Sequence, residues 1–216
     1  MPSFDFFLQN LPLLLQGALG TVAISLVGLV FGFVIGTLVC AARMSRHPAL
    51  RRFGALYVGF FRGVPLLVQL LLVYYFLPFV GLNVSPIVAA ISAVSLCSAS
   101  YVAEIMRGGF LGIPGGQLEA AQMLGLPAGS TLLRIQVPQA FRLTVPSLVN
   151  EMVLLIKASS LISVVGVAEL TRTAQNLAAS TFRPLDIYLS AGLIYFVING
   201  VLSLAGHAVE RQLKKA

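Results

Sequence analysis

The chain has 216 residues, a net charge of +7 and a mean hydropathy of +0.94, with 58% hydrophobic and only 10% charged residues. Soluble domains carry about 25% charged residues and disordered chains are poor in apolar residues, so this composition excludes both classes. Several apolar runs reach about 18 residues, the length that crosses a bilayer as a helix. The predicted fold class is all-α, a polytopic membrane protein.

The first apolar stretch runs from about residue 17 to residue 42 and contains no charged residue. Arginines follow this stretch and no Lys or Arg precedes it, so the positive-inside rule places the N-terminus outside and the next loop in the cytoplasm. The same asymmetry excludes a cleavable signal peptide. Residues 1–16 are predicted to form a short interfacial segment at the outer face.

Two further spans are predicted over residues 63–82 and 84–105. Residues 53–62 are predicted to approach the second span along the cytoplasmic interface. The second span carries one strongly polar residue, Gln69, which we expect to hydrogen-bond within the helix bundle rather than to bind a ligand. The third span is rich in Ala and Ser, which is typical of close helix packing.

Residues 143–167 and 187–208 are predicted as the fourth and fifth spans, and residues 209–216 as a basic cytoplasmic tail. Between these spans, Glu169 and Arg172 stand three residues apart, as on one helix face. With five spans, the N-terminus outside and the C-terminus inside, most of the fourteen Lys and Arg residues are cytoplasmic. The positive charge therefore indicates membrane orientation, and no nucleic-acid partner is predicted.

The cytoplasmic interval between the third and fourth spans is punctuated by Pro and Gly. Pro114 suits a helix start, and good helix formers follow it. Gly125 suits a left-handed C-terminal cap. Pro127 permits a second short helix, which Pro138 is expected to interrupt. The pattern predicts a hairpin beneath the membrane that either only connects two spans or docks a partner through exposed apolar side chains.

This hairpin, residues 114–138, resembles the EAA loop of ABC importer permeases. The loop pattern is E-A-A, three residues, G, nine residues and I-x-L-P, and the sole departure here is Val137 for Leu. The residues that match are Glu119, Ala120, Ala121, Gly125, Ile135 and Pro138. Four further blocks are similar to the polar amino acid permease family of the histidine, glutamine and arginine type: RGVPLLVQL (62–70), YVAEIMRGG (101–109), NEMVLLIKASSL (150–161) and TFRPLDIYL (181–189).

The resemblance implies a type-1 ABC transmembrane domain over residues 17–208 and an importer of polar amino acids in the bacterial plasma (inner) membrane. It implies that the hairpin is a coupling helix, with Glu119 and Gly125 in contact with two separate ATPase subunits. A second permease chain, the same or similar, and an extracytoplasmic amino-acid-binding protein are also implied. The chain has no G-x-x-x-x-G-K-[ST] phosphate loop. We therefore predict no catalytic residue and no cofactor in this chain, with ATP and Mg²⁺ bound by the ATPase.

Ionisable residues at membrane depth usually face a cavity or a partner. Asn150 and Lys157 share a helix face because seven residues make about two turns, and Glu151 lies one position round. These groups suit the ammonium and carboxylate of an amino acid. Alternatively, Lys157 pairs with Glu151 or Glu104 and only holds helices together. The candidates for the substrate path are Gln69, Glu104, Asn150, Glu151, Lys157, Ser159 and Ser160.

The remaining polar groups indicate structural roles. Glu104 and Arg107 stand three residues apart, which favours a local ion pair over a gate or pocket. The only two cysteines lie inside apolar runs, and neither they nor the two histidines have a companion at metal-ligand spacing, so no metal site is predicted.

Two other functions are weighed against an ATP-driven importer. An ion-driven secondary transporter or channel is disfavoured because the sequence shows no internal repeat and no broken-helix pair. An intramembrane hydrolase would need Ser159 or Ser160 to reach Lys157, and positions two or three apart on one helix aim poorly at each other.

Overall fold

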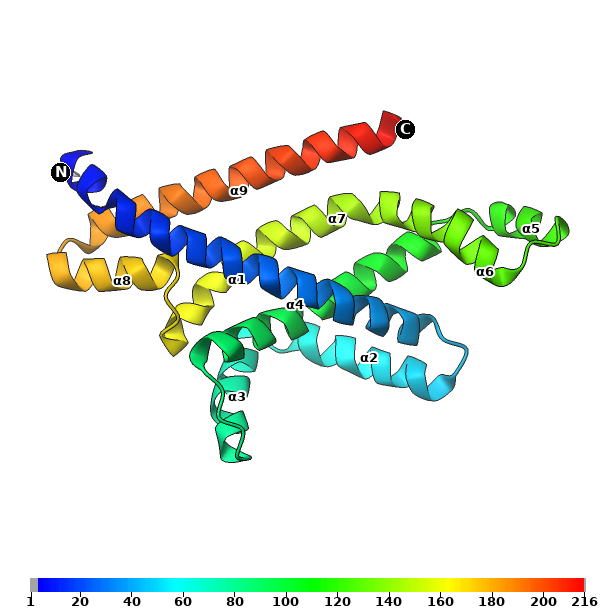
Figure 1. The fold of residues 1–216 in the computed structure, drawn as a ribbon, viewed down its shortest axis with the longest axis horizontal. Coiled ribbons are helices and arrows are strands. Elements are labelled where there is room, and N and C mark those ends of the chain that lie inside the picture. The colour runs from blue at the N-terminus through cyan, green and yellow to red at the C-terminus, as the bar shows by residue number, and fades with distance from the viewer. Residues whose placement is uncertain (1–3, 216) are drawn as a thin grey trace.

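The computed structural model describes residues 4–215, and this part of the chain is helical apart from short connections and contains no β-strand (Figure 1). The all-α prediction is therefore confirmed. The elements, in chain order, are α1 (Phe4–Met44), α2 (Pro48–Gly63), α3 (Leu66–Phe79), α4 (Pro86–Leu111), α5 (Gly115–Met123), α6 (Ala128–Thr131), the π-helical turn η1 (Leu132–Gln136), α7 (Val137–Ala158), the 3-10 segment η2 (Ser159–Val165), α8 (Leu170–Thr181) and α9 (Pro184–Lys215).

Several helices are long and apolar enough to cross a membrane, as a polytopic protein requires. Within the described residues they are Asp5–Met44, Pro86–Leu111, Ala128–Val165 and Pro184–Leu213, and the bent pair α2–α3 makes a fifth if it is counted as one span. The two ends of the chain lie at opposite ends of the elongated molecule (Figure 1). The five-span count and the N-outside orientation stay predictions.

The first helix starts earlier than the sequence suggested. Residues 4–16, predicted as part of a separate interfacial segment, are the first turns of α1, which continues unbroken to Met44. Leu14 in this stretch is fully buried against α8 and α9. This packing explains why the helix extends, because tertiary contacts commonly decide where a helix ends. Residues 1–3 of the predicted segment lie outside the described residues.

The second predicted span, residues 63–82, is helical over Leu66–Phe79, and this helix is long enough to cross a membrane only if it is counted together with α2. Helices α2 and α3 meet at an angle of 105°. Val64, between them, has extended backbone angles (φ −98°, ψ 131°), because the residue before a proline is pushed out of the helical region and Pro65 follows it. Helix α3 consequently turns away from the bundle (Figure 1).

The prediction that Pro138 interrupts the helix is wrong. Helix α6 continues through η1 into α7, and Pro138 lies in the first turn of α7. A proline lacks an N–H donor and its ring crowds the carbonyl of the residue four positions earlier. The wider π-helical turn just before Pro138 relieves this conflict. The fourth span therefore begins within the predicted loop rather than at residue 143.

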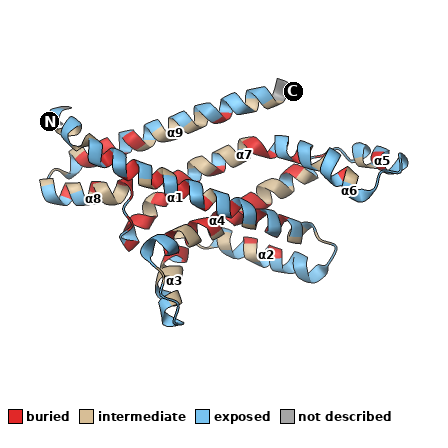
Figure 2. Ribbon diagram, viewed as in Figure 1, coloured by how far each residue is buried: buried red, intermediate tan, exposed pale blue. Residues whose placement is uncertain are grey.

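The long helices α1 and α4 form the centre of the molecule. Gly28, Gly32 and Gly36 of α1 face α4, where a Cβ at any of the three would come within 3.0 Å of α4 atoms. The glycines thus let the two helices approach closely, as small residues do in membrane bundles. Figure 2 shows buried residues concentrated along this crossing, while the outer faces of α1, α3 and α9 are exposed.

Candidate functional site

The hairpin projects from one end of the bundle, beyond the ends of α4 and α7 (Figure 1). Helix α5 begins directly after Pro114 and ends at Met123, and Gly125, two residues later, has a positive φ of 69°. The backbone N–H of Leu126 donates to Ala121 O at 3.0 Å and that of Gly125 to Gln122 O at 2.9 Å. These two bonds form a Schellman cap. The predicted left-handed cap at Gly125 is therefore confirmed.

The outer surface of the hairpin combines apolar side chains with one carboxylate. Met123 is 91% and Leu124 is 78% exposed, and Glu119 is exposed on the same short helix. Glu119 forms no salt bridge with any described residue. Ala121, in contrast, is buried and faces the chain's own structure. The hairpin therefore presents side chains that nothing within the described chain covers.

The rest of the EAA-like pattern lies in the joint between the hairpin and the membrane bundle. Ile135 is half-buried in η1, and Pro138 is exposed at the start of α7. The side-chain amide of Gln139 donates to Gln117 Oε1 at 2.6 Å, so α7 is tied to α5. Helix α5 is thus connected to the first turn of α7 through both the backbone and this bond.

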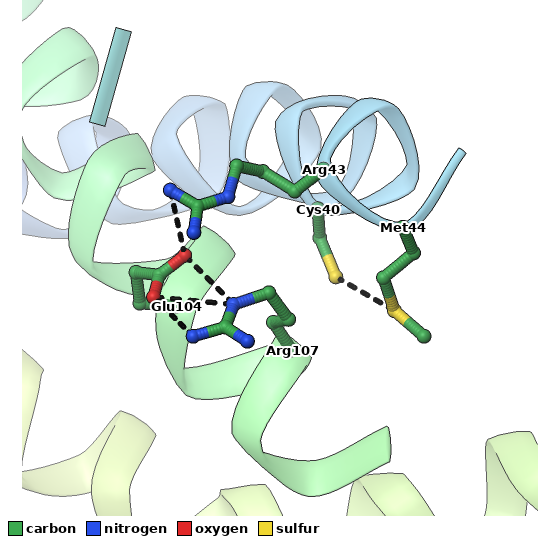
Figure 3. Close-up of polar contacts among 5 residues, drawn as sticks. All are labelled: Cys40, Arg43, Met44, Glu104 and Arg107. Atoms are coloured by element: carbon green, nitrogen blue, oxygen red, sulfur yellow. Dashed lines mark hydrogen bonds and ion pairs between the residues drawn. The ribbon is translucent and has the colours of Figure 1, made fainter. Parts of the chain in front are cut away.

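Glu104 lies in an ion cluster near the hairpin end of α4 (Figure 3). Arg107 Nε donates to Glu104 Oε1 at 3.0 Å, and Arg107 Nη2 donates to Oε2 at 2.7 Å. Arg43 of α1 reaches the same carboxylate at 3.5 Å. The local pair expected from the spacing is present. The second arginine comes from a different helix, so the cluster also joins α1 to α4.

Gln69 and Glu151 lie near the bend between α2 and α3. Gln69 Nε2 donates to Phe61 O at 2.9 Å and to Val64 O at 2.7 Å, which fastens α3 to the end of α2. Its Oε1 is buried and has no partner among the described residues. Glu151 of α7 is also buried, with 6% of its surface exposed.

Asn150 and Lys157 are both exposed and lie on a different face of α7 from the buried Glu151, which is one position round the helix from Asn150. Among the described residues, Lys157 forms no salt bridge with Glu151 or Glu104. Asn150 lines a groove of about 360 Å³ between α7 and α9. The structure therefore separates the polar stripe of Asn150 and Lys157 from the buried carboxylate of Glu151.

The two serines at the end of α7 bond to their own backbone. Ser159 Oγ donates to Ile156 O and Ser160 Oγ donates to Lys157 O, each at 2.8 Å. Ser159 is fully buried. These bonds accompany the change from α-helix to the tighter segment η2, and neither hydroxyl is directed at the amine of Lys157.

The sequence did not predict the buried hydrogen-bond cluster around Glu169. Glu169 is completely buried and caps α8, accepting from the backbone N–H of Thr171 at 2.9 Å and of Arg172 at 2.6 Å. Its Oε2 also accepts from Thr21 of α1 at 3.2 Å and from Tyr195 of α9 at 3.0 Å. The spacing to Arg172 suggested side chains on one helix face. The observed bond instead involves the backbone of Arg172.

Comparison with known proteins places the chain among transport proteins. The family model for the inner membrane component of binding-protein-dependent transport systems matches residues 28–215. The arginine transport system permease protein ArtQ of Bacillus subtilis is 37% identical over 98% of this chain and 97% of its own length. The glutamine transport system permease protein GlnP of Escherichia coli is 38% identical over 94% of each chain.

Solved structures agree with these relatives. The crystal structure of an amino acid ABC transporter with histidines matches with a TM-score of 0.93 and 32% identity, over 98% of this chain and 99% of that chain. An inward-facing structure of the MetNI methionine ABC transporter matches with a TM-score of 0.80 over 95% of this chain and 98% of that chain. Its identity is 22%, so this second likeness shows the fold alone.

Proposed function

Because this chain belongs to the family of binding-protein-dependent transport system inner membrane components, we propose that it carries polar amino acids into a bacterial cell through the plasma (inner) membrane. It is an amino acid permease of an ABC transporter. In the proposal, two separate ATPase subunits bind ATP and Mg²⁺ and supply the driving force. An extracytoplasmic binding protein delivers the amino acid.

The observation that carries this proposal is the exposed hairpin. A carboxylate and two large apolar side chains project from one end of the bundle without partners in the described chain. Such a surface suits a groove that offers apolar contacts and a basic group, because a charge-assisted hydrogen bond from Arg or Lys is strong and directional. Glu119 supplies the charge in this proposal, and Gly125 supplies the sharp turn that presents it.

Movement of the hairpins is the proposed route from ATP to the membrane. When the ATPase subunits close on ATP, the hairpins follow, and α7 moves with them because η1 and the Gln139–Gln117 bond join the two parts. Two permease chains, identical or similar, rock against each other and expose the path alternately to either side. A single chain with four or five spans is too small to enclose such a path alone.

Different polar residues of the spans are proposed to bind the two charged groups of the substrate. An amino acid zwitterion carries an ammonium and a carboxylate group. Glu151 and the unpartnered oxygen of Gln69 suit the ammonium group. Lys157, which shares an exposed face with Asn150, suits a carboxylate at a separate position along the path. Ser159 and Ser160 are occupied by backbone bonds. Glu104 is held by two arginines, which favours a structural role.

Charge reversal at the hairpin tests the coupling. In Glu119→Lys we expect amino acid uptake to fall about tenfold or more, the equivalent of one lost charge-assisted bond, while ATP hydrolysis stops responding to the binding protein. Asp5→Lys is the matched control, because it reverses an exposed carboxylate at the opposite end of the molecule. Wild-type uptake in Glu119→Lys would defeat the proposal.

The bent pair α2–α3 is the one observation that favours ion-driven transport instead, since broken helices near the membrane centre are typical of secondary transporters. That alternative predicts uptake by this chain alone in liposomes under an ion gradient. The ATP-driven proposal predicts no uptake unless the ATPase subunits and ATP are present.

A further inference from the structure

The groove of about 360 Å³ between α7 and α9 is polar, although both helices belong to stretches that are long and apolar enough to cross a membrane. Five of its nine lining residues have polar side chains: Ser147 and Asn150 on α7, and Ser203, His207 and Glu210 on α9. Polar and ionisable groups on such helices face water or a partner, because hydrocarbon does not solvate them.

A close contact between the two helices forms one boundary of this polar groove. A Cβ on Gly206 of α9 would overlap the side chain of Val149 of α7, so the glycine lets the helices approach. The polar lining residues recur at spacings of three or four on each helix, which places them on one face of that helix. Two short rows of polar side chains therefore flank the groove.

The lining offers mainly hydrogen-bond acceptors. His207 Nδ1 lies 2.7 Å from Ser203 O. A carbonyl oxygen only accepts, so Nδ1 carries the proton and Nε2 of the neutral ring is an acceptor. Glu210 adds a carboxylate, which can accept several hydrogen bonds at once, and Asn150 adds an amide oxygen. Among the described residues that line the groove, none is Lys or Arg. A cation that donates hydrogen bonds therefore fits this lining.

We propose that this groove binds the ammonium or guanidinium group of the transported amino acid on the inner part of its path. The inference rests on the proposed function, in which substrate leaves toward the hairpin end. The lining residues of α9 lie in the C-terminal third of that helix, toward the same end of the molecule (Figure 1). Asn150 also shares an exposed face of α7 with Lys157, so the groove continues the polar stripe of that helix.

Two other occupants fit this lining less well. A lipid acyl chain offers no donor to the acceptors of the groove. The exposed side chains of α9 outside the groove are mostly apolar, among them Phe196, Val201 and Leu204. A second copy of the chain that inserted such a face would leave the acceptors without partners, which costs free energy.

The reactivity of an introduced cysteine tests the groove without a transport measurement. Ser147→Cys places a thiol at an exposed position of the lining, and the native cysteines are buried. The permease–ATPase complex, in lipid nanodiscs without nucleotide, is treated with a trimethylammonium or a sulfonate methanethiosulfonate, and each rate is divided by that of free cysteine. We expect both reagents to react, the cationic one about fivefold faster because a carboxylate is near. Val201→Cys, exposed on α9 outside the groove, is the control that should react with neither.

A second substitution and a competing cation identify the groups responsible. Adding Glu210→Gln to Ser147→Cys should abolish the preference for the cationic reagent and leave the thiol reactive. Asp5→Asn, which neutralises an exposed carboxylate at the opposite end of the molecule, should keep the preference. Methylammonium chloride should slow the labelling of Ser147→Cys more than sodium chloride at the same concentration.

Three results would overturn the proposal. A thiol at Ser147→Cys that reacts with neither reagent would mean that lipid or a second permease chain covers the groove. Equal normalised rates for the two reagents would mean that the groove holds water without favouring cations. Equal effects of methylammonium and sodium would exclude binding of an ammonium group. These measurements involve neither ATP hydrolysis nor uptake, so their failure is distinct from a failure of the coupling tested by Glu119→Lys.

Discussion

Two glutamates of this chain have opposite surroundings. Glu119 of the hairpin is exposed and has no ion-pair partner among the described residues, whereas Glu169 is 0% exposed and accepts hydrogen bonds from four donors on α1, α8 and α9. Both are single carboxylates in a chain poor in charge. Their difference separates a group that is available to another protein from one that the fold itself uses.

The buried glutamate shows how a membrane bundle tolerates a charge. Hydrogen bonds to the charged form replace the water that a buried carboxylate loses. Around Glu169 they come from two backbone N–H groups and two hydroxyls. The exposed glutamate needs no such partners within its own chain. Stability should therefore depend on Glu169, and function should depend on Glu119.

The largest expected effect is the loss of the buried carboxylate. Glu169→Ala leaves the backbone N–H groups of Thr171 and Arg172 without their acceptor and removes the carboxylate that Thr21 and Tyr195 share, so we expect it to lower the free energy of unfolding by about 3 kcal/mol or more. Glu119→Ala removes an exposed side chain and should change it by less than about 0.5 kcal/mol. Thermal unfolding of both variants in detergent micelles measures the contrast. Equal losses in the two variants would erase the distinction between the two regions.

A smaller effect is expected at the ion cluster on α4. Glu104→Gln removes the charge that holds Arg107 and Arg43, at a side chain that is 18% exposed. Because the site is partly open to solvent, we expect a loss of about 1–2 kcal/mol. A double-mutant cycle with Arg107→Gln, followed by unfolding, measures the coupling of the pair. Strictly additive losses would mean that the observed contact contributes nothing.

Two glycines of the hairpin should respond to substitution by alanine with changes in stability of opposite sign. Gly125→Ala places a Cβ at a positive φ of 69°, which costs about 1–2 kcal/mol. Gly116→Ala lies in α5 with open space around it, so it should stabilise that helix by about 0.5–1 kcal/mol. Hydrogen exchange at the amide of Leu126 reports both changes. Faster exchange in Gly116→Ala than in Gly125→Ala would contradict the assigned turn.

The smallest change removes one donor from the buried cluster. Tyr195→Phe deletes the hydroxyl that donates to Glu169 and contacts Thr171 at 3.0 Å, while the other three donors to Glu169 remain. We expect a loss of about 1 kcal/mol in the free energy of unfolding. Chemical denaturation measures this value. A loss as large as that of Glu169→Ala would show that the tyrosine, rather than the carboxylate, organises the site.

Local patterns predicted much of this molecule correctly. The long apolar runs indicated the helices, and the Pro114 to Gly125 interval indicated the capped helix α5, because both signals reside in neighbouring residues. The bend before Pro65 also has a local cause that the sequence contains. Pro138 was misjudged because a rule for regular α-helix does not hold where a π-helical turn precedes the proline.

Contacts between residues far apart in the sequence could not be predicted from such local patterns. Thr21 and Glu169 are 148 positions apart, and Arg43 reaches Glu104 only because α1 and α4 pack closely. Nothing in the sequence around Glu169 indicates that its carboxylate is buried, since the segment that it starts is one of the more polar in the chain. Tertiary packing decides which of the charged residues are used by the fold.

Site-directed cross-linking of the assembled transporter tests the role of the hairpin most directly. The native cysteines Cys40 and Cys97 are both buried, so a photoreactive maleimide should label an introduced surface cysteine selectively. Met123→Cys is placed on the hairpin at a side chain that is 91% exposed, and Phe182→Cys is placed at the opposite end of the molecule at one that is 88% exposed. The account predicts a cross-link from Met123→Cys to the ATPase subunit and none from Phe182→Cys. A cross-link from Phe182→Cys alone would contradict it.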